Sequence, residues 1–273
     1  MITFPNSKIN LGLWVTQRRA DGYHNIQTVM FPVPWCDILE IVPATAKGTS
    51  LVVTGKQLDA PPENNLCFRA WQLMAENYGI PAVKMHLHKV VPSGAGLGGG
   101  SSDASFALKM FNSIFRLGLD NESLRLLAVQ LGMDCPFFVE NVPSLSSGRG
   151  DFLKPVPINL DGFHLLLVKP QIHVSTAAAF AGTRPLYREN SIAEIVSLHI
   201  AEWKKELHND FEDTVFDLYP EIQEIKYRMY RQGAVYSAMS GSGSAVFGLF
   251  TGKPVQLDFT GYEVFQSLLG GHP

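Results

Sequence analysis

The stretch from Val91 to Ser105, reading VPSGAGLGGGSSDAS, holds the residues of this chain best suited to chemistry. Five glycines lie between Pro92 and Ser101. Glycine lacks a Cβ atom, so its backbone can adopt left-handed conformations and lie close against a ligand. A helical pattern follows, and the unpaired amides at a helix N-terminus attract anions. The stretch therefore predicts a phosphate-binding loop; the alternative is a glycine-rich connector that binds nothing.

A strand and a helix are expected to hold this loop in place. Apolar residues alternate with others over residues 83–89, which is typical of a strand. After the loop, apolar residues recur at helical spacing over residues 104–115, and we expect the helix to run to about residue 117. Ser101 or Ser102 is suited to cap its N-terminus.

Three kinds of phosphate-binding loop can be compared with this sequence. A Walker loop needs glycine, lysine and a hydroxyl residue in succession, and this run does not occur. A dinucleotide fingerprint matches Gly94, Gly96 and Gly99, but it needs a second strand ending in an acidic residue about 20 residues on. A second helical pattern, residues 124–131, occupies that place. The third kind is the P-x-x-x-G-L-G-(S/G)-S-S loop of the GHMP kinases, a family that includes galactokinase, homoserine kinase and mevalonate kinase, and this sequence resembles it. The matching residues are Pro92, Ser93, Gly94, Ala95, Gly96, Leu97, Gly98, Gly99, Gly100, Ser101 and Ser102.

Further stretches resemble one branch of the GHMP kinases, which serves the non-mevalonate isoprenoid pathway. They are residues 5–11 (PNSKINL), 19–28 (RADGYHNIQT) and 131–138 (LGMDCPFF). The resemblance is densest in the first 140 residues and weaker after Gly150. The Asp-Gly-Tyr-His segment is its most specific part.

The resemblance implies that Lys8 and Asp134 are the catalytic pair. Phosphoryl transfer needs a nucleotide cradle, neutralised charge and an oriented acceptor hydroxyl. Asp134 lies among apolar residues, and partial desolvation makes a carboxylate more basic. From spacing alone, a helix-capping aspartate is the simpler interpretation. Lys8 would keep Asp134 ionised and stabilise developing charge, whereas by itself it is typical of a solvated lysine at a strand edge.

The resemblance also implies where the acceptor binds. Asn10, Tyr23 and His24 align with family positions that contact substrate, and the histidine is expected to read a cytosine base. Thr176 and Phe180 align with positions that line a cytidine pocket, in a segment less rich in proline than the family's form. Without the resemblance, Tyr23 and His24 are ordinary loop residues, and Phe180 is a core residue of a helix with small side chains.

Other residues align with family positions around the nucleotide. Asn65, Leu66 and Lys89 align around the adenine; the alternatives are a helix cap, a core residue and a strand-edge lysine. The Gly241-Ser242-Gly243 motif resembles the family's third motif, which closes near the phosphates; the alternative is a tight hairpin turn. The implied cofactors are ATP and Mg²⁺, and the sequence indicates no metal ligand.

Size, charge and cysteine content restrict the class of protein. The chain has 273 residues, 46% of them hydrophobic, and a net charge of −3. A large core can therefore form, and no global basic field attracts nucleic acid or an anionic membrane. Cys36, Cys67 and Cys135 show no metal or disulfide spacing, which indicates a reducing compartment, and we expect core packing for Cys135. Neither a signal peptide nor a membrane-spanning apolar run is evident, so we expect a cytoplasmic protein that acts on a small molecule.

The order of elements predicts an α+β protein. We expect two domains, residues 1–150 with the glycine loop and the catalytic residues, and residues 151–273. Ser144–Gly150 is expected to be a loop at their boundary. Before the boundary, strands are expected near residues 9–15, 26–33, 37–42 and 50–54, and helices near 66–78 and 121–131. After it, we expect a strand at 163–168, helices at 192–207 and 220–232, and strands at 234–239 and 245–250. The resemblance implies the two-domain GHMP kinase fold with the active site between the domains.

The expected function is ATP-dependent phosphorylation of a hydroxyl on an acceptor that carries cytosine. One alternative is another GHMP kinase, acting on a sugar or homoserine, against which residues 21–24 argue. A second is a nicotinamide-dependent dehydrogenase, which the missing second strand argues against. A third is a non-catalytic binding protein with the same fold.

Overall fold

The structure is a computed structural model that describes residues 1–45, 48–57, 61–254 and 259–270. The described residues form two compact units. The first draws on Met1–Ser7, Pro34–Ser93 and Gly98–Val142, and the second on Lys8–Val33, Gly94–Leu97 and the residues from Pro143 onward. The units interleave along the chain, because each draws on several of its segments.

The first unit is a sheet covered by helices. Its elements are β1 (Ile2–Thr3), β4 (Ile38–Pro43), β5 (Ser50–Gly55), the short 3₁₀ helix η1 (Pro62–Asn64), α1 (Leu66–Tyr78), β6 (Val83–Lys89), α2 (Gly99–Ile114), α3 (Asn121–Leu131) and α4 (Phe137–Glu140). The strand order is β1-β4-β6-β5. Because β5 pairs with β6 in parallel, α1 serves as the crossover between them.

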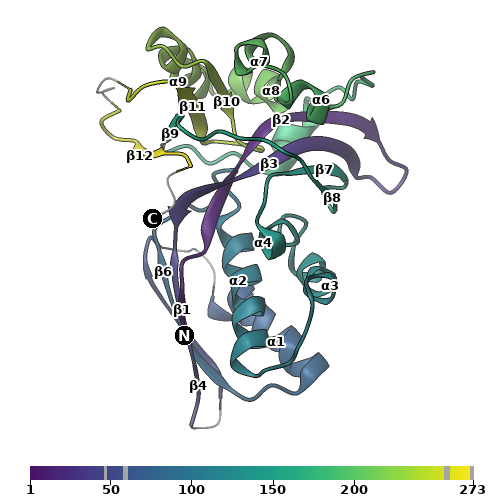
Figure 1. The fold of residues 1–273 in the computed structure, drawn as a ribbon, viewed down its shortest axis with the longest axis vertical. Helices are drawn as coiled ribbons and strands as arrows, with labels where there is room; N and C mark the ends of the chain where they lie inside the picture. Colours follow the sequence, from purple (N-terminus) through teal and green to yellow (C-terminus); the bar gives the residue numbers. More distant parts are fainter. Residues whose placement is uncertain (46–47, 58–60, 255–258, 271–273) are drawn as a thin grey trace. The chain divides into compact units, whose positions relative to one another are not determined.

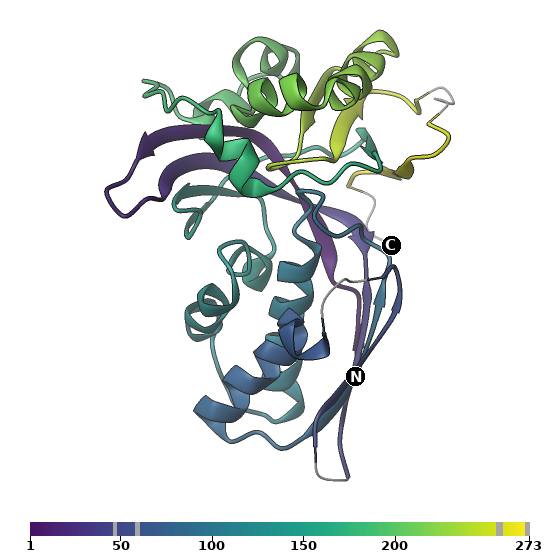
Figure 2. The ribbon, with the colours of Figure 1, turned by 180° about the vertical axis from the view of Figure 1, so that it is seen from behind.

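The core of the first unit lies between this sheet and its helices. Leu39 and Ile41 of β4 and Met85 and Leu87 of β6 are buried at alternate positions, as the sequence pattern predicted. They pack in one cluster with apolar side chains of α1–α4, and Figures 1 and 2 show these helices gathered on one side of the sheet. Cys135 belongs to this cluster, which confirms the expected packing role.

The second unit contains two sheets and five helices among its described residues. Its elements are β2 (Asn6–Arg18), β3 (His24–Cys36), β7 (Ser144–Gly148), β8 (Phe152–Pro155), β9 (His164–Lys169), α5 (Thr176–Ala181), α6 (Ile192–Val196), α7 (Ile200–Glu206), α8 (Phe211–Leu218), α9 (Pro220–Arg231), β10 (Tyr236–Met239), β11 (Val246–Phe250) and β12 (Glu263–Leu268). Only the first two residues of β2 and the last three of β3 group with the first unit. The strand orders are β2-β3-β7-β8 and β10-β11-β9-β12. Helix α9 packs on β10 and β11, with Ile222, Ile225 and Met229 in the core (Figure 1).

Two expectations about the second half of the chain are wrong. Ser144–Gly148 is strand β7 rather than a loop, because its backbone pairs with β3 and the small side chain of Ser146 fits a fully buried position. The helix expected at 192–207 is two helices, α6 and α7. Ser197 ends α6, and its hydroxyl donates to the carbonyl of Glu194 at 2.6 Å, a local bond that competes with continuation of the helix.

The elements β1, η1, β8, α8 and β12 have no counterpart among those expected from the sequence. Helix α2 also ends earlier than expected, at Ile114. No helix among the residues that the structure describes is long and apolar enough to cross a membrane.

Candidate active site

The glycine loop adopts backbone conformations that require glycine. Gly94, Gly96 and Gly98 have φ angles of +61°, +77° and +69°, in the left-handed region that other residues avoid. Space is equally restrictive at Gly96, where an added Cβ would lie 1.9 Å from the carbonyl oxygen of Ser240. At Gly94, it would lie 3.0 Å from the Nδ1 atom of His173. The absence of a side chain at these three glycines lets the backbone amides of the loop approach a phosphate group closely.

Helix α2 begins where the loop ends, and its cap differs from the expected one. Gly98 is the N-cap and makes no side-chain cap hydrogen bond, so Ser101 and Ser102 lie within the helix. The amides of its first turn have no partner inside the helix, as at any helix N-terminus. Ser102 is fully buried, and its Oγ has no hydrogen-bond partner among the described residues. A buried hydroxyl without a partner costs about 1–3 kcal/mol, and a bound phosphate or water would remove this cost.

Lys8 is attached to the glycine loop within the second unit. Its side chain is buried, and its ammonium donates to the Gly96 carbonyl oxygen at 2.9 Å and to Asn10 Oδ1 at 2.6 Å. Its backbone amide also donates to the Leu97 carbonyl oxygen at 2.9 Å. The alternative of a solvated strand-edge lysine is wrong, because β2 places this side chain inside the unit.

Asn10 and Ser240 complete this cluster. The Asn10 side-chain amide donates to Thr28 Oγ1 at 3.0 Å, and Thr28 donates to the Gly12 carbonyl oxygen at 2.5 Å. Ser240 Oγ accepts from the Asn10 backbone amide at 3.3 Å and donates to the Gly96 carbonyl oxygen at 2.9 Å. Lys8, Asn10, Gly96 and Ser240 therefore share one set of hydrogen bonds, which we call the Lys8 cluster.

The Gly241-Ser242-Gly243 motif lies in the connection between β10 and β11. The two strands pair in antiparallel register up to Met239 and Val246, so the alternative of a hairpin turn is confirmed. The turn also contacts the glycine loop, since the Ala245 amide donates to the Ala95 carbonyl oxygen at 3.2 Å. Ser242 Oγ lies 3.2 Å from Thr176 Oγ1, the first residue of α5. The motif is thus a hairpin that contacts the glycine loop and α5.

The aromatic residues expected to bind cytosine contact each other. His24 and Phe180 are stacked, with ring centroids 4.8 Å apart and an interplanar angle of 15°. Phe211 contacts Phe180 edge-on at 4.7 Å. Tyr23 is 60% exposed, and its ring lies 5.8 Å from the Arg149 guanidinium carbon. The stacked His24 ring therefore covers one face of Phe180.

Asn65 and Leu66 of the first unit have structural roles here. Asn65 is the N-cap of α1 and accepts from the Cys67 amide at 2.9 Å, which confirms the cap alternative. Leu66 packs against the core of this unit. Contact with an adenine stays a prediction for both residues.

Lys89 forms an ion cluster that the sequence analysis did not find. Its ammonium contacts Asp37 and donates to Asp103 at 2.7 Å, and all three side chains are buried. Burial and the neighbouring Asp37 raise the pKa of Asp103 to about 7, although Lys89 opposes this shift. Asp37 also accepts from the amides of Val90 and Val91, which lead into the glycine loop. The cluster therefore joins the residue before β4, the end of β6 and the second turn of α2.

Asp134 lies in the turn between α3 and α4 and is half-buried. The N-cap position of α4 belongs to Pro136, so Asp134 does not cap that helix. The buried Cys135 that follows helps to fix this turn, since its amide donates to the Gly132 carbonyl oxygen at 3.1 Å. The Ser105 hydroxyl of α2 donates to the Cys135 carbonyl oxygen at 2.7 Å and ties the turn to that helix.

Comparison with known proteins places the chain in a family. The model of the GHMP kinase N-terminal domain matches residues 65–141, and that of the GHMP kinase C-terminal domain matches residues 191–257. A 4-diphosphocytidyl-2-C-methyl-D-erythritol kinase of Bacteroides thetaiotaomicron is 49% identical over 92% of this chain and 92% of its own. One from Chlorobium limicola is 39% identical over 89% of this chain and 86% of its own.

The chain belongs to the 4-diphosphocytidyl-2-C-methyl-D-erythritol kinase family.

Solved structures agree with this family. A crystal structure of 4-(cytidine 5'-diphospho)-2C-methyl-D-erythritol kinase has a TM-score of 0.78 and 33% identity, and the match covers 91% of this chain and 90% of that one. A homoserine kinase from Cytophaga hutchinsonii shares the fold. Its TM-score is 0.71 at 16% identity, and the match covers 96% of this chain and 94% of that one. The predicted α+β GHMP kinase fold and the predicted class of ATP-dependent small-molecule kinase are confirmed. The dehydrogenase alternative is wrong: α3 follows α2, where a dinucleotide fold needs a strand.

Two residues that bond to Lys8-cluster members were not singled out from the sequence, Ser240 and Thr28, although Ser240 directly precedes the Gly241-Ser242-Gly243 motif. Their signal was weak because a serine or a threonine can form such bonds in any turn. Only pairing of β2 with β3, and of β10 with β11, brings them to the Lys8 cluster.

Proposed function

We propose that this chain transfers the γ-phosphoryl group of ATP to the 2-hydroxyl of 4-diphosphocytidyl-2-C-methyl-D-erythritol. The single observation that carries this proposal is the bond from the Lys8 ammonium to the carbonyl of Gly96, because it joins a cation to a left-handed glycine loop. The names of the relatives support the acceptor.

The glycine loop and the first turn of α2 fit the phosphates of a nucleotide. A side chain at position 96 is excluded, and the Ser102 hydroxyl lacks a partner among the described residues. We propose that amides of residues 94–102 hold the phosphates, with Asn65, Leu66 and Lys89 on the adenine side. The burial of Lys89 in its ion cluster limits it to an indirect role there.

Magnesium is part of this proposal, since it neutralises phosphate charge when bound with the nucleotide. Among the described residues, no cluster of three or more His, Cys, Asp or Glu side chains could hold a metal ion. Mg²⁺ commonly keeps phosphate and water ligands and few protein ones, so the Ser102 hydroxyl is the protein group that we propose beside it.

The protein's own groups then carry the proton and the developing charge. Asp134 takes the proton of the acceptor hydroxyl, and Lys8 stabilises the charge that develops on the acceptor oxygen. Asn10 keeps the Lys8 ammonium in place at 2.6 Å. Phe180 offers its face to cytosine, His24 reads the polar edge after moving from its stack, and Tyr23 and Thr176 line the pocket.

The domain organisation and location belong to the same proposal. We propose residues 1–150 and 151–273 as the family's two domains, because each family match lies inside one of them. A cytoplasmic location is supported by the three free cysteines.

The test is ADP release measured with four acceptors: the cytidine acceptor, its uridine analogue, galactose and homoserine. We expect the largest specificity constant for the cytidine acceptor. Equal use of the uridine analogue, or preference for galactose or homoserine, would contradict the assignment while leaving the kinase class intact. Asp134→Asn should lower turnover ~100- to 10,000-fold with ATP affinity nearly unchanged, since it removes only the proton acceptor.

A further inference from the structure

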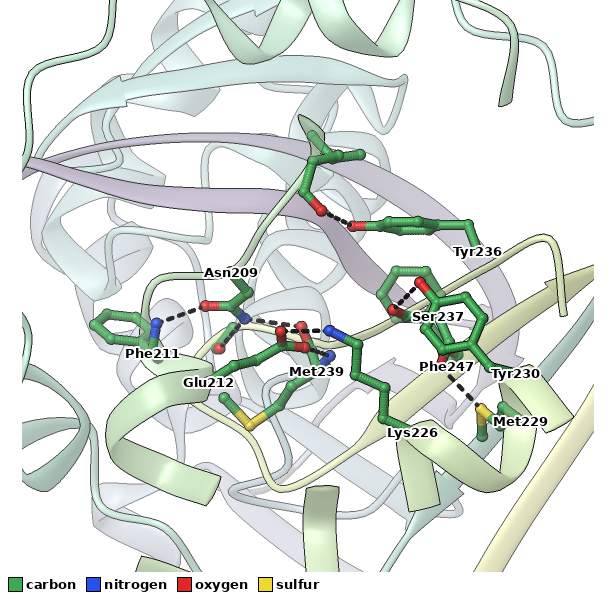
Figure 3. A network of polar contacts seen from close by, with 12 residues as sticks. Asn209, Phe211, Glu212, Lys226, Met229, Tyr230, Tyr236, Ser237, Met239 and Phe247 are labelled. Atoms are coloured by element: carbon green, nitrogen blue, oxygen red, sulfur yellow. Dashed lines mark hydrogen bonds and ion pairs between the residues drawn. The ribbon is translucent and has the colours of Figure 1, made fainter. Parts of the chain in front are cut away.

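A polar network in the second unit leads from α9 to the Lys8 cluster. Asn209, just before α8, is buried, and its side-chain amide donates to the carbonyl oxygens of Met239 and Gly241, both at 2.8 Å. Its Oδ1 accepts from the Phe211 amide at 3.0 Å. This side chain therefore makes three hydrogen bonds, and Figure 3 shows those to Phe211 and Met239. The two bonds that it donates hold the carbonyl groups on either side of Ser240.

Glu212 and Lys226 support the same stretch from the other side. Glu212 Oε1 accepts from the Met239 amide at 2.8 Å, and its Oε2 accepts from Lys226 at 2.6 Å. Figure 3 shows these side chains converging on Met239 from α8 and α9. Both peptide groups of Met239 are thus bonded to side chains, at the end of β10.

Ser240 connects the held backbone of residues 239–241 to the other residues of the Lys8 cluster. Its hydroxyl contacts the Gly96 carbonyl oxygen and the Asn10 backbone, and these two residues supply the oxygens to which the Lys8 ammonium donates. A shift of Ser240 would therefore displace both oxygens together. The carbonyl oxygen of Ser240 also packs directly against Gly96, so the turn and the glycine loop cannot move closer together.

From these contacts we infer that Ser240 and Asn209 are positioning residues for Lys8. Asn209 fixes the backbone path of residues 239–241. Ser240 in turn fixes the positions of Gly96 and Asn10, whose oxygens hold the Lys8 ammonium in place. The inference rests on the proposed function for the catalytic role of Lys8, but the positioning itself is a property of the second unit alone.

The chain offers a matched control in Ser237. This serine is also fully buried, lies in β10 three residues before Ser240, and donates to the Phe247 carbonyl oxygen at 2.8 Å. Within the described part of the chain, its hydroxyl bonds to Phe247 and Met229 and not to the Lys8 cluster, and Figure 3 shows it on a separate branch of bonds. Ser240→Ala and Ser237→Ala therefore remove the same atom from similar surroundings.

The first experiment compares turnover in these two variants. We expect Ser240→Ala to lower kcat about 10- to 100-fold, as a small displacement of a catalytic group does, with the KM for ATP changed less than about threefold. Ser237→Ala should keep kcat within about twofold at a similar loss of thermal stability. Asn209→Asp, which replaces the two donors by an acceptor, should resemble Ser240→Ala. Equal kcat in Ser240→Ala and Ser237→Ala would overturn the inference.

The second experiment is a double-mutant cycle. If Ser240 acts through Lys8, Ser240→Ala should lower kcat by no more than about twofold in a Lys8→Met background, because residues acting as a unit are not additive. A full additive loss would mean that Ser240 has another role and would overturn the inference.

A crystal structure of Ser240→Ala provides a readout independent of the acceptor. We expect the Lys8 ammonium to leave hydrogen-bond distance of Gly96, and to stay there in Ser237→Ala. If wild type fails to phosphorylate the cytidine acceptor but this displacement is seen, the proposed function fails and the positioning inference stands. If the ammonium does not move, the positioning inference fails whatever the activity.

Discussion

The two lysines that are buried among the described residues are held by different chemistry. Lys89, in the first unit, donates to Asp103 and contacts Asp37, so a buried cation lies between two carboxylates. Lys8, in the second unit, donates within that unit to neutral oxygens of Asn10 and Gly96. Both carbonyl and carboxylate partners satisfy an ammonium, but the consequences of losing the lysine differ.

Because their partners differ, we expect the two lysines to matter for different properties of the protein, one for its stability and the other for its activity. Removing one member of a buried ion cluster leaves charges that no water can solvate, and this destabilises the fold. Removing the Lys8 ammonium from Asn10 and Gly96 leaves two dipoles in the second unit, which cost less to leave unpaired than buried charges do. We therefore expect changes at Lys89 to appear in the free energy of unfolding, and changes at Lys8 to appear in the rate.

The largest effect is expected for Lys89→Met. The carboxylates of Asp37 and Asp103 would remain buried without their cation, and the free energy of unfolding should fall by about 3–5 kcal/mol. Urea denaturation measures it. Lys84→Met on the exposed face of the same strand is the control and should change stability by less than about 0.5 kcal/mol. Similar losses in both variants would show that the ion cluster contributes nothing specific.

Lys8→Met should act mainly on the chemical step. Loss of one preorganised donor typically lowers kcat about 100- to 1,000-fold, and circular dichroism and calorimetry should show a folded protein that still binds ATP. Together with a destabilised Lys89→Met protein, this outcome would show that Lys8 serves the reaction and Lys89 serves the stability of the fold. A Lys8→Met protein that is unfolded, or one with wild-type kcat, would remove the contrast.

Gly96→Ala tests the contact between the glycine loop and the Ser240 turn. The φ angle of +77° and the 1.9 Å approach of a Cβ to the Ser240 carbonyl oxygen leave no room for a methyl group. We expect ATP affinity to weaken about 30-fold, or ~2 kcal/mol. Gly118→Ala, with a φ of +70° but no atom within 4 Å of the added Cβ, isolates the backbone strain and should leave ATP affinity unchanged.

Asp103→Asn should change how stability depends on pH. The pKa of Asp103 is raised from 3.8 to about 7, so between these values the folded protein keeps a proton that the unfolded chain has lost. The contribution of this group to stability is therefore full below about pH 4 and is lost as pH rises through about 7. We expect the stability of wild type relative to Asp103→Asn to fall by ~2 kcal/mol between pH 5 and pH 8, measured by urea denaturation. A constant difference across this range would show that Asp103 is ionised throughout.

The smallest effect is expected at the aromatic stack. Phe180→Ala should raise the KM for the cytidine acceptor about tenfold, since stacking of a base on an aromatic side chain contributes ~1–3 kcal/mol. The KM for ATP should change little. Phe216→Ala, which also removes a half-buried ring at the same core, should lower stability without raising the acceptor KM. Equal acceptor constants in the two variants would argue against a cytosine site at Phe180.

Much of the fold and the identity of the loop could be predicted from the sequence. The alternation over residues 83–89 and the apolar spacing after residue 104 are local patterns, and β6 and α2 follow them. The role of the glycines at 94, 96 and 98 could be predicted for the same reason, because a positive φ angle is a property of a single residue. The capping role of Asn65 is likewise set by its immediate neighbours.

Only the tertiary structure decided the polar clusters and the strand at Ser144–Gly148. Asp37, Lys89 and Asp103 are far apart in the sequence, and each one alone is typical of a solvated surface charge. Strand β7 has a composition typical of a loop and exists because β3 supplies its hydrogen bonds. Ser240 and Lys8 are 232 positions apart, yet both contact the Gly96 carbonyl oxygen. Local patterns determine which elements form, whereas long-range pairing determines which polar groups meet and share a charge or a hydrogen bond.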